Sequence, residues 1–69
     1  MIRFGLIGCG RISDSHFKAV ESIDTAEIVS CCDIVTEKAK EKAEQYKIGS
    51  YYTDYKKMIE TEKLDAVIV

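Results

Sequence analysis

The sequence predicts an α/β fold with a parallel sheet whose strands lie in the spatial order 3-2-1-4. Three observations support this fold class: short apolar runs alternate with segments of helical length, the runs are apolar on both faces, and the connections are short. Strands that are apolar on both faces are typical of parallel sheets covered by helices. Right-handed crossovers between consecutive strands then place the first strand inside the sheet.

The first predicted strand is the apolar run 2–7, which is interrupted only by Arg3 and Gly5 and ends at Gly8-Cys9-Gly10. A helix over residues 11–23 is predicted to follow. Its side chains recur at i, i+4, i+7, i+8 and i+11, which is the spacing of one helical face. The face that we expect to be buried comprises Ile12, His16, Ala19, Val20 and Ile23.

The second predicted strand, residues 26–32, is β-branched in its middle and ends at Asp33. We expect Thr36 to cap a helix that runs through Tyr46 and ends at Ile48-Gly49. The apolar stripe of this helix is narrow and consists mainly of small residues, so the helix can lie close to the sheet. The small residues are Ala39 and Ala43.

Residues 50–52 predict a short edge strand, and Asp54 is placed to cap a third helix that contains Met58. The fourth predicted strand, residues 66–69, reaches the end of the sequence without a turn or a polar tail. A parallel strand in that place needs cover on both faces and a neighbour on its open side. We therefore expect the chain to be the first half of a larger domain.

Charge and composition exclude several classes of protein. With 10 basic and 12 acidic side chains, a net charge of −2 and 46% apolar residues, the chain should fold. It offers no basic face for nucleic acid or anionic lipid. No apolar run approaches the roughly 20 residues of a membrane span, and no secretory leader is visible. We expect a cytoplasmic protein that binds neither nucleic acid nor membrane.

The cysteines predict neither a disulfide framework nor a metal site, because they are odd in number and form no C-x-x-C pair. Cys31 and Cys32 are interpreted as small core residues, and the backbone of Cys9 is expected to matter more than its thiol. His16 is expected to be a packing residue. The tyrosines at 51, 52 and 55 are expected to cover the sheet edge rather than an adenine. We find no nucleophile beside a base, and expect no catalytic residue in this chain.

The turn Gly8-Cys9-Gly10-Arg11-Ile12-Ser13 matches the pattern G-x-G-x-x-G in its first two glycines and has Ser at the third position. The first glycine permits a tight turn from strand to helix, and the second lets the backbone approach a pyrophosphate. The N–H groups of Arg11 and Ile12, at the positive end of the helix dipole, complete an anion site. The turn therefore predicts a Rossmann-like dinucleotide site.

Asp33 lies 20 residues after Ser13, at the tip of the second predicted strand. An acidic residue in this place accepts hydrogen bonds from the ribose hydroxyls of a dinucleotide. A carboxylate repels a 2′-phosphate, which favours NAD, whereas Arg11 and Lys38 can reach a phosphate and leave NADP open. The alternative is a structural turn in which Asp33 is a loop or cap residue.

Five segments together resemble a specific family. They are residues 4–12 with His16, Cys32-Asp33, the alanine-spaced helix through Tyr46, Tyr52-Thr53-Asp54-Tyr55, and residues 64–69. The chain is similar, over its entire length, to the oxidoreductases named after glucose-fructose oxidoreductase, inositol dehydrogenase and the rhizopine-catabolism protein MocA. Ser13 departs from this family, which usually has Ala or Gly there.

The resemblance implies a two-domain NAD(P)-dependent dehydrogenase that transfers hydride to or from a sugar, polyol or inositol. It implies that the substrate domain, a catalytic lysine in a Glu-Lys-Pro motif and the contacts of a homo-oligomer lie outside these 69 residues. By position, the family's pyrophosphate turn and adenosine-ribose site fall on Gly8, Cys9, Gly10, Arg11 and Ile12, and on Asp33 and Ile34.

Two other functions stay open at this point. Proteins similar to this family but without the lysine can hold a nucleotide as non-catalytic sensor modules. A methyltransferase that uses S-adenosylmethionine also has an acidic residue at the end of its second strand, although the turn and the Tyr-Thr-Asp stretch favour the dehydrogenase.

Overall fold

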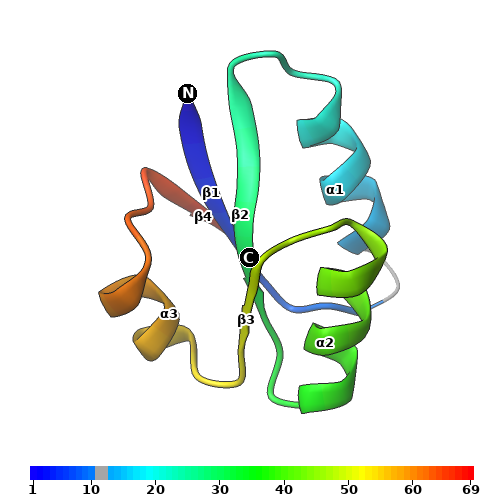
Figure 1. The fold of residues 1–69 in the computed structure, drawn as a ribbon, viewed down its shortest axis with the longest axis vertical. Coiled ribbons are helices and arrows are strands. Elements are labelled where there is room, and N and C mark those ends of the chain that lie inside the picture. Colours follow the sequence, from blue (N-terminus) through cyan, green and yellow to red (C-terminus); the bar gives the residue numbers. More distant parts are fainter. Residues whose placement is uncertain (11–12) are drawn as a thin grey trace.

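A parallel sheet forms the middle layer of the structure, a computed structural model that describes residues 1–10 and 13–69 (Figure 1). In these residues the sheet has four strands, in the order β3-β2-β1-β4. All neighbouring strands run parallel. The predicted fold class and strand order are therefore confirmed. The strands are β1 (Ile2–Ile7), β2 (Ala26–Cys32), β3 (Ser50–Tyr52) and β4 (Ala66–Ile68).

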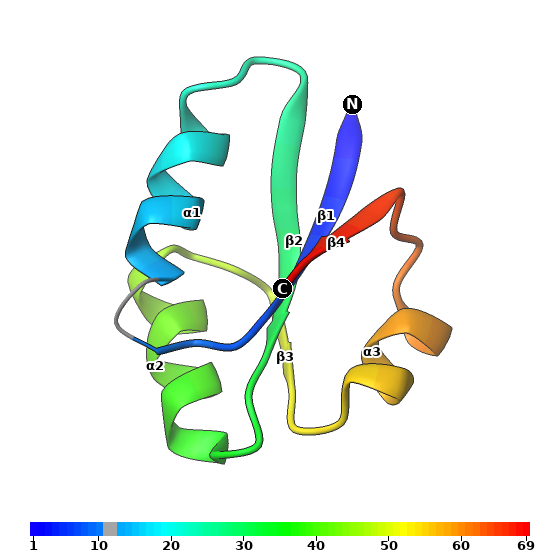
Figure 2. The same cartoon turned by 180° about the vertical axis from the view of Figure 1, so that it is seen from behind.

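The helices cover both faces of the sheet. The first two, α1 (Ser13–Glu21) and α2 (Thr36–Gln45), lie on one face, and α3 (Tyr55–Thr61) lies on the other. Figure 2 shows the same three layers from behind. The chain therefore changes sides after β3, which brings β4 next to β1 on the side away from β2.

The register of the strands brings the loops that follow them to one edge of the sheet. Ile7, the last residue of β1, lies opposite Cys32, the last residue of β2. The N–H of Gly8 donates to the Cys32 carbonyl at 2.7 Å, and the N–H of Asp33 donates to the Tyr52 carbonyl at 3.0 Å. The residues after β1, β2 and β3 are thus held side by side, at the lower edge in Figure 1.

The main core lies between the sheet and the pair α1 and α2. Ala39 and Ala43 of α2 are 0% and 4% exposed, so the predicted stripe of small residues does face the sheet. Their short side chains allow the helix backbone to approach β2 closely. The buried members of this core are Leu6, Cys9, Phe17, Cys31, Ala39 and Ala43.

The predicted buried face of α1 is confirmed at Val20 and is otherwise wrong by one position. The side chains that the helix buries are those of Ser13, Phe17 and Val20, whereas Ile23 is 48% exposed. The ring of Phe17 explains why a different face of α1 is buried. It stacks on the ring of Tyr46, the residue after the end of α2, with centroids 4.1 Å apart and planes 11° apart. Of the other predicted members, Ala19 is exposed, His16 is half-buried and Ile12 lies outside the described residues.

The helix caps agree with the sequence at one of two positions. Asp54 caps α3 as predicted, and its Oδ1 accepts the N–H of Lys56 at 2.9 Å. Thr36 does not cap α2: the N-cap residue is Val35, which makes no capping bond with its side chain. Instead, Oδ1 of Asp33 accepts the Val35 N–H at 2.8 Å, so the carboxylate two residues earlier satisfies the backbone there.

The end of α2 also differs from the prediction. The left-handed residue is Lys47, with φ of 56°, rather than Gly49. The N–H of Ile48 donates to the Ala43 carbonyl at 2.7 Å, and the N–H of Lys47 donates to the Glu44 carbonyl at 3.4 Å. These two bonds define a Schellman motif, in which the left-handed position is usually glycine.

A polar cluster ties α1 to the end of α2. Oδ1 of Asp14 accepts from Nζ of Lys42 at 2.7 Å and from the hydroxyl of Tyr46 at 2.8 Å. The Lys42 ammonium, followed by the Tyr46 hydroxyl, holds the pKa of Asp14 below its ordinary value of 3.8. The same carboxylate contributes to raising the pKa of Tyr46, after the effect of burial.

We expect Lys47→Gly to stabilise the fold by about 1 kcal/mol, because glycine adopts the left-handed conformation without the steric cost of a Cβ. In a chain of this size that corresponds to a rise in Tm of about 4–8 °C, measured by thermal unfolding. Lys47→Ala is the matched control, because it removes the charge and keeps the Cβ. An equal rise in Tm for both variants would contradict the backbone explanation.

We expect the contribution of Asp14 to stability to depend on pH. Because the pKa of Asp14 is lowered in the folded state, its contribution is present above about pH 4 and is lost as the pH falls through the folded-state pKa. Thermal unfolding of the wild type and Asp14→Asn should therefore differ at pH 7 and converge as the pH falls through the folded-state pKa of Asp14. A difference that stays constant over this range would show that the ionised carboxylate is not the cause.

Candidate functional site

The candidate site lies at the carboxyl edge of the sheet, where the chain leaves β1 and β2. These two strands are neighbours at the centre of the order β3-β2-β1-β4, and the connections on either side of β1 run over opposite faces of the sheet. In open α/β sheets, ligands bind in the crevice beyond the carboxyl ends of strands at such a switch point. The turn at residues 8–10 and the loop at residues 33–35 meet there.

Gly8 begins the turn in a conformation that favours glycine. Its φ is 97°, in the region that side chains with a Cβ rarely adopt. The short bond from its N–H to the Cys32 carbonyl fixes the start of the turn against the end of β2. The first glycine of the motif therefore has the steric role that the sequence predicts.

Gly10 has a different reason to be glycine. Its φ lies outside the left-handed region, and no described atom other than those of its chain neighbours lies within 4 Å of the place where a Cβ would be. The fold of the described residues would thus accept a side chain here. The open space lies beside the backbone of Gly10, and a pyrophosphate requires such space at the second glycine of the motif. The turn therefore fits a dinucleotide.

Ser13 explains how the third position of the motif accommodates a residue larger than glycine. Its side chain is completely buried, and its hydroxyl donates to the Gly10 carbonyl at 2.6 Å. The N–H of Ser13 donates to the same oxygen at 3.0 Å. The serine thus closes the turn from the helix side, and its polar atom is satisfied. Arg11 and Ile12, the predicted anion-binding residues between them, lie outside the described residues.

Asp33 joins the two loops of the site. Its Oδ2 accepts the N–H of Cys9 at 2.9 Å, and its Oδ1 accepts the N–H of Val35 at 2.8 Å. The Val35 bond and, to a smaller extent, the Cys9 bond and the charge of Lys38 lower the pKa of Asp33. Asp33 is therefore ionised at neutral pH, and its negative charge lies directly beside the glycine turn.

The structural and ligand-binding interpretations of Asp33 are compatible. An ionised carboxylate has about four acceptor sites, and the two amides occupy one on each oxygen. The remaining sites can accept hydroxyl donors. Asp33 does act as a loop residue, as the alternative interpretation holds, and its two bonds leave acceptor sites on both oxygens.

Two hollows lie near the glycine turn, and Asp33 lines one of them. One, of about 180 Å³, is lined by the carboxyl ends of β1 and β2 and by the loop after β3, with Asp33 and the 90% exposed Ile34 on its wall. The other, of about 260 Å³, has Cys9 and Gly10 on one side and charged residues of α2 on the other. The first is lined by Ile7, Gly8, Cys32, Asp33, Ile34, Thr53 and Tyr55, and the second by Cys9, Gly10, Lys38, Glu41 and Lys42.

Sequence reasoning assigned Thr53 no role at the site and expected Tyr55 to cover the sheet edge. Both line the hollow beside Asp33, and Tyr55 is 47% exposed. Tyr51 and Tyr52 line a separate hollow with Thr36 and Asp54. The strand order could have placed these two residues at the site, because residues that follow β3 must meet those that follow β2 at the same edge of a parallel sheet.

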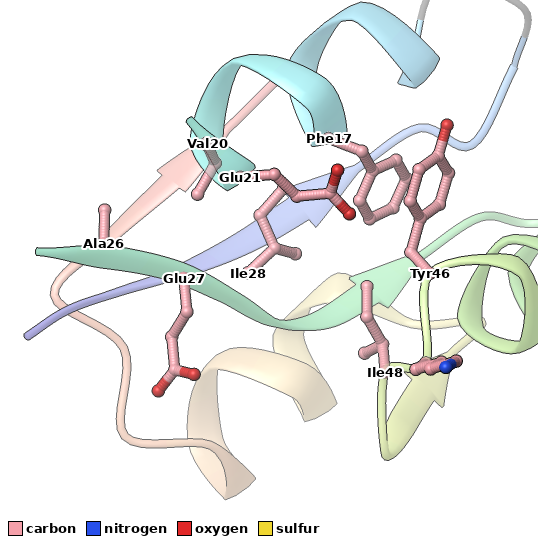
Figure 3. A pocket seen from close by; sticks show the side chains of 9 residues that line it. Phe17, Val20, Glu21, Ala26, Glu27, Ile28, Tyr46 and Ile48 are labelled. Carbon is pink, nitrogen blue, oxygen red and sulfur yellow. The ribbon is translucent and has the colours of Figure 1, made fainter. Parts of the chain in front are cut away.

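A fourth hollow, of about 230 Å³, lies near the opposite edge of the sheet and contains none of the predicted site residues. Figure 3 shows it beside the start of β2, with the rings of Phe17 and Tyr46 against each other and Ile28 below. This hollow lies between the carboxyl ends of α1 and α2. The sheet edge with the glycine turn therefore remains the candidate site.

The described residues add no second chemical centre. Among them, no group of three His, Cys, Asp or Glu side chains is arranged to hold a metal ion. The three cysteines are free and buried, as expected for core residues. None of the described helices is long and apolar enough to cross a membrane.

Comparisons with known proteins agree with this geometry. The chain is 40% identical over 62 residues to D-apiose dehydrogenase from Paraburkholderia graminis, covering 90% of this chain and 16% of that protein. It is 32% identical to myo-inositol 2-dehydrogenase from Thermotoga maritima, covering 99% of this chain and 20% of that protein. The chain thus spans about a fifth of the length of the relatives that it matches.

Solved structures give the same result for the fold. The WlbA dehydrogenase from Bordetella pertussis, in complex with NADH and UDP-GlcNAcA, superposes with a TM-score of 0.90 at 33% identity. The superposition covers 99% of this chain and 20% of that one. A probable dehydrogenase from Thermotoga maritima superposes with a TM-score of 0.86 at 32% identity, over 96% of this chain and 20% of the other.

The family model that matches residues 2–69 is described as an oxidoreductase family with an NAD-binding Rossmann fold. This match covers both loops of the candidate site and decides against the methyltransferase alternative. The chain belongs to the glucose-fructose oxidoreductase, inositol dehydrogenase and MocA family of oxidoreductases, as the resemblance of its glycine turn and its Tyr-Thr-Asp stretch implies.

Proposed function

We propose that residues 1–69 are the first half of the cofactor-binding domain of an NAD-dependent oxidoreductase. The observation that carries the proposal is the Asp33 carboxylate, which hydrogen-bonds to the backbone of the glycine turn and faces the hollow at the sheet edge. Family membership and the NADH-bound structural relative support the choice of cofactor.

The pyrophosphate of the dinucleotide lies over the turn at Gly8, Cys9 and Gly10 in this proposal. The open side of Gly10 lets the phosphate oxygens approach the backbone. The start of α1 supplies the positive end of the helix dipole. Arg11 and Ile12 occupy that first turn in the sequence and are proposed to donate their amides.

The adenosine ribose lies beside Asp33, whose free acceptor sites receive its two hydroxyl groups. Ile34, which is 90% exposed, supplies apolar cover for the adenine at the mouth of the hollow. A 2′-phosphate in the same place would meet the ionised carboxylate of Asp33. Lys38 lies near enough to influence Asp33 and reduces this repulsion, so we propose NAD as the preferred cofactor and NADP as the weaker one.

NAD accepts or supplies the hydride when it is bound, and the residues of this chain bind and orient it. The matched relatives are dehydrogenases of apiose and of inositol. We therefore propose a sugar, polyol or inositol as the substrate. The substrate domain, the lysine that transfers the proton and the contacts of a homo-oligomer are proposed to belong to parts of the protein outside these residues. The free cysteines are compatible with the reducing cytoplasm as its location.

We expect Gly10→Val to weaken NADH binding at least about tenfold, because its side chain would fill the space of the pyrophosphate. The fold should be retained, since no described atom lies within 4 Å of the added Cβ other than those of its neighbours in the chain. Calorimetric titration with NADH measures the Kd, and thermal unfolding checks the fold.

Gly49→Val is the matched control for this substitution. The Cβ position of Gly49 is equally open, its φ also lies outside the left-handed region, and it lies outside both hollows of the site. Its Kd for NADH should equal that of the wild type. Unchanged NADH affinity in a folded Gly10→Val variant would overturn the assignment of the pyrophosphate.

We expect Asp33→Asn to reduce the preference for NADH over NADPH by about tenfold, because it removes the charge that repels a 2′-phosphate and one acceptor of the ribose hydroxyls. The ratio of the two Kd values is the informative quantity, since damage to the loop would weaken both ligands together. Glu37→Gln removes the same charge from the exposed first turn of α2 and should leave the ratio unchanged. An unchanged ratio in Asp33→Asn would place the ribose elsewhere.

A further inference from the structure

A negative charge lies at the start of α1, close to the turn on which the pyrophosphate is proposed to bind. Asp14 is the second residue of this helix and follows Ser13, whose hydroxyl and N–H both donate to the Gly10 carbonyl. The Lys42 ammonium, followed by the Tyr46 hydroxyl, lowers the pKa of Asp14, so its carboxylate is charged at neutral pH. A carboxylate in the first turn stabilises a helix, but it repels a phosphate that approaches the same helix end.

Lys42, in the last turn of α2, brings a positive charge to this place. The start of α1 lies beside the end of α2 (Figure 1), and Nζ of Lys42 is 2.7 Å from Oδ1 of Asp14. The side chain of Lys42 is 13% exposed and that of Asp14 is 40% exposed. Salt screens an ion pair that is partly withdrawn from water less than it screens a surface pair. Lys42 therefore offsets the charge of Asp14 at this end of α1.

Lys42 also faces the glycine turn. It lines the hollow of about 260 Å³ to which Cys9 and Gly10 contribute the opposite wall. An ammonium group has three N–H donors and no acceptor. Within the described residues, Oδ1 of Asp14 accepts one of these donors at 2.7 Å and Oε1 of Gln45 accepts a second at 3.4 Å. These bonds leave one donor for a ligand oxygen in the hollow.

Two other charged residues line the same hollow. Lys38 and Glu41 have opposite charges, and both are exposed. Exposed charges of this kind contribute little to the free energy of an interaction, because water and salt screen them. Of the charged residues in this lining, Lys42 is the one whose side chain is held in place by bonds to other described residues. It is therefore the cation that can act on a ligand with a fixed geometry.

We propose that Lys42 is the cation that adapts the glycine turn to a pyrophosphate. It offsets the Asp14 carboxylate at the start of α1, and its remaining N–H donates to a phosphate oxygen in the hollow beside Gly10. This role rests on the proposed function, which places the pyrophosphate on the turn. It extends the site from the two loops to the last turn of α2, which neither the glycine pattern nor Asp33 includes.

The test compares three ligands that differ in their phosphates, in NMR titrations of the whole chain with NADH, ADP and adenosine. Lys42→Met should weaken the binding of NADH and ADP about tenfold, because a charge-assisted hydrogen bond is lost and the charge of Asp14 is no longer offset. The affinity for adenosine, which has no phosphate, should stay unchanged. If Lys42 merely joined the two helices, its loss would weaken all three ligands together, and this result would overturn the proposal.

Lys40→Met is the matched control for this substitution. It removes the same charge from the same helix, at an exposed position that does not line the hollow. All three affinities should equal those of the wild type. Thermal unfolding of both variants checks the fold. A loss of ADP affinity in Lys40→Met as large as that in Lys42→Met would show that the net charge of the chain, and not Lys42, is the cause.

A second substitution tests the offset of Asp14 directly. When Asp14→Asn is added to Lys42→Met, the carboxylate that needs to be offset is removed together with its partner. The double variant should therefore bind ADP more tightly than Lys42→Met alone, although less tightly than the wild type, because the donor of Lys42 is still missing. An affinity equal to that of Lys42→Met would overturn the electrostatic part of the proposal.

The wild type alone gives a further measurement, which holds even if a variant fails to fold. The side-chain ammonium resonance of Lys42 should shift on binding of ADP and stay in place with adenosine. A wild type that binds ADP no more tightly than adenosine would overturn the proposed pyrophosphate site, and the role of Lys42 with it. If the wild type prefers ADP but the Lys42 resonance does not shift, the proposed function stands and the role of Lys42 is wrong.

Discussion

The site depends on one interaction, the pair of hydrogen bonds that the Asp33 carboxylate accepts from Cys9 and Val35. It holds the turn after β1 against the loop after β2, and it satisfies the backbone N–H of Val35, the N-cap residue that precedes α2. The bonds also lower the pKa of Asp33, so a full negative charge is fixed at the centre of the carboxyl edge of the sheet. One side chain therefore supports the fold and also belongs to the candidate site.

The parallel sheet makes this interaction available. Because β1 and β2 end in register, the two loops begin side by side, and the N–H of Gly8 donates to the Cys32 carbonyl. Polar groups at this edge belong to the glycine turn, to Asp33 and to the start of α2. The hollow at the opposite edge is lined by side chains of α1, β2 and the end of α2, among them Phe17, Val20 and Ile28.

Much of the fold could be predicted from the sequence because the order of the elements and the rules of chain connection indicate the same topology. Alternating strands and helices, together with the handedness of crossovers, leave few topologies, and the order β3-β2-β1-β4 was among them. The errors arose where several residues compete for one local role. The face of α1 depended on the stacking of Phe17 on Tyr46, and the ends of α2 depended on Asp33 and on a left-handed Lys47. Periodicity and residue preference alone do not report such contacts.

For the site, Gly8, Gly10 and Asp33 could be predicted from the sequence. Thr53 and Tyr55 could be placed there only once the pairing of β3 with β2 was known.

The central claim is that the turn and Asp33 form one NAD-binding unit. The most direct test follows backbone amide resonances during separate NMR titrations with NADH and NADPH. The account predicts that the amides of residues 8–10 and 33–35 shift together, with a single affinity that is higher for NADH. Cys9 and Val35 should be among them, because their N–H groups are bonded to the same carboxylate. Shifts confined to residues around Phe17 and Tyr46, or equal affinities for the two nucleotides, would contradict it.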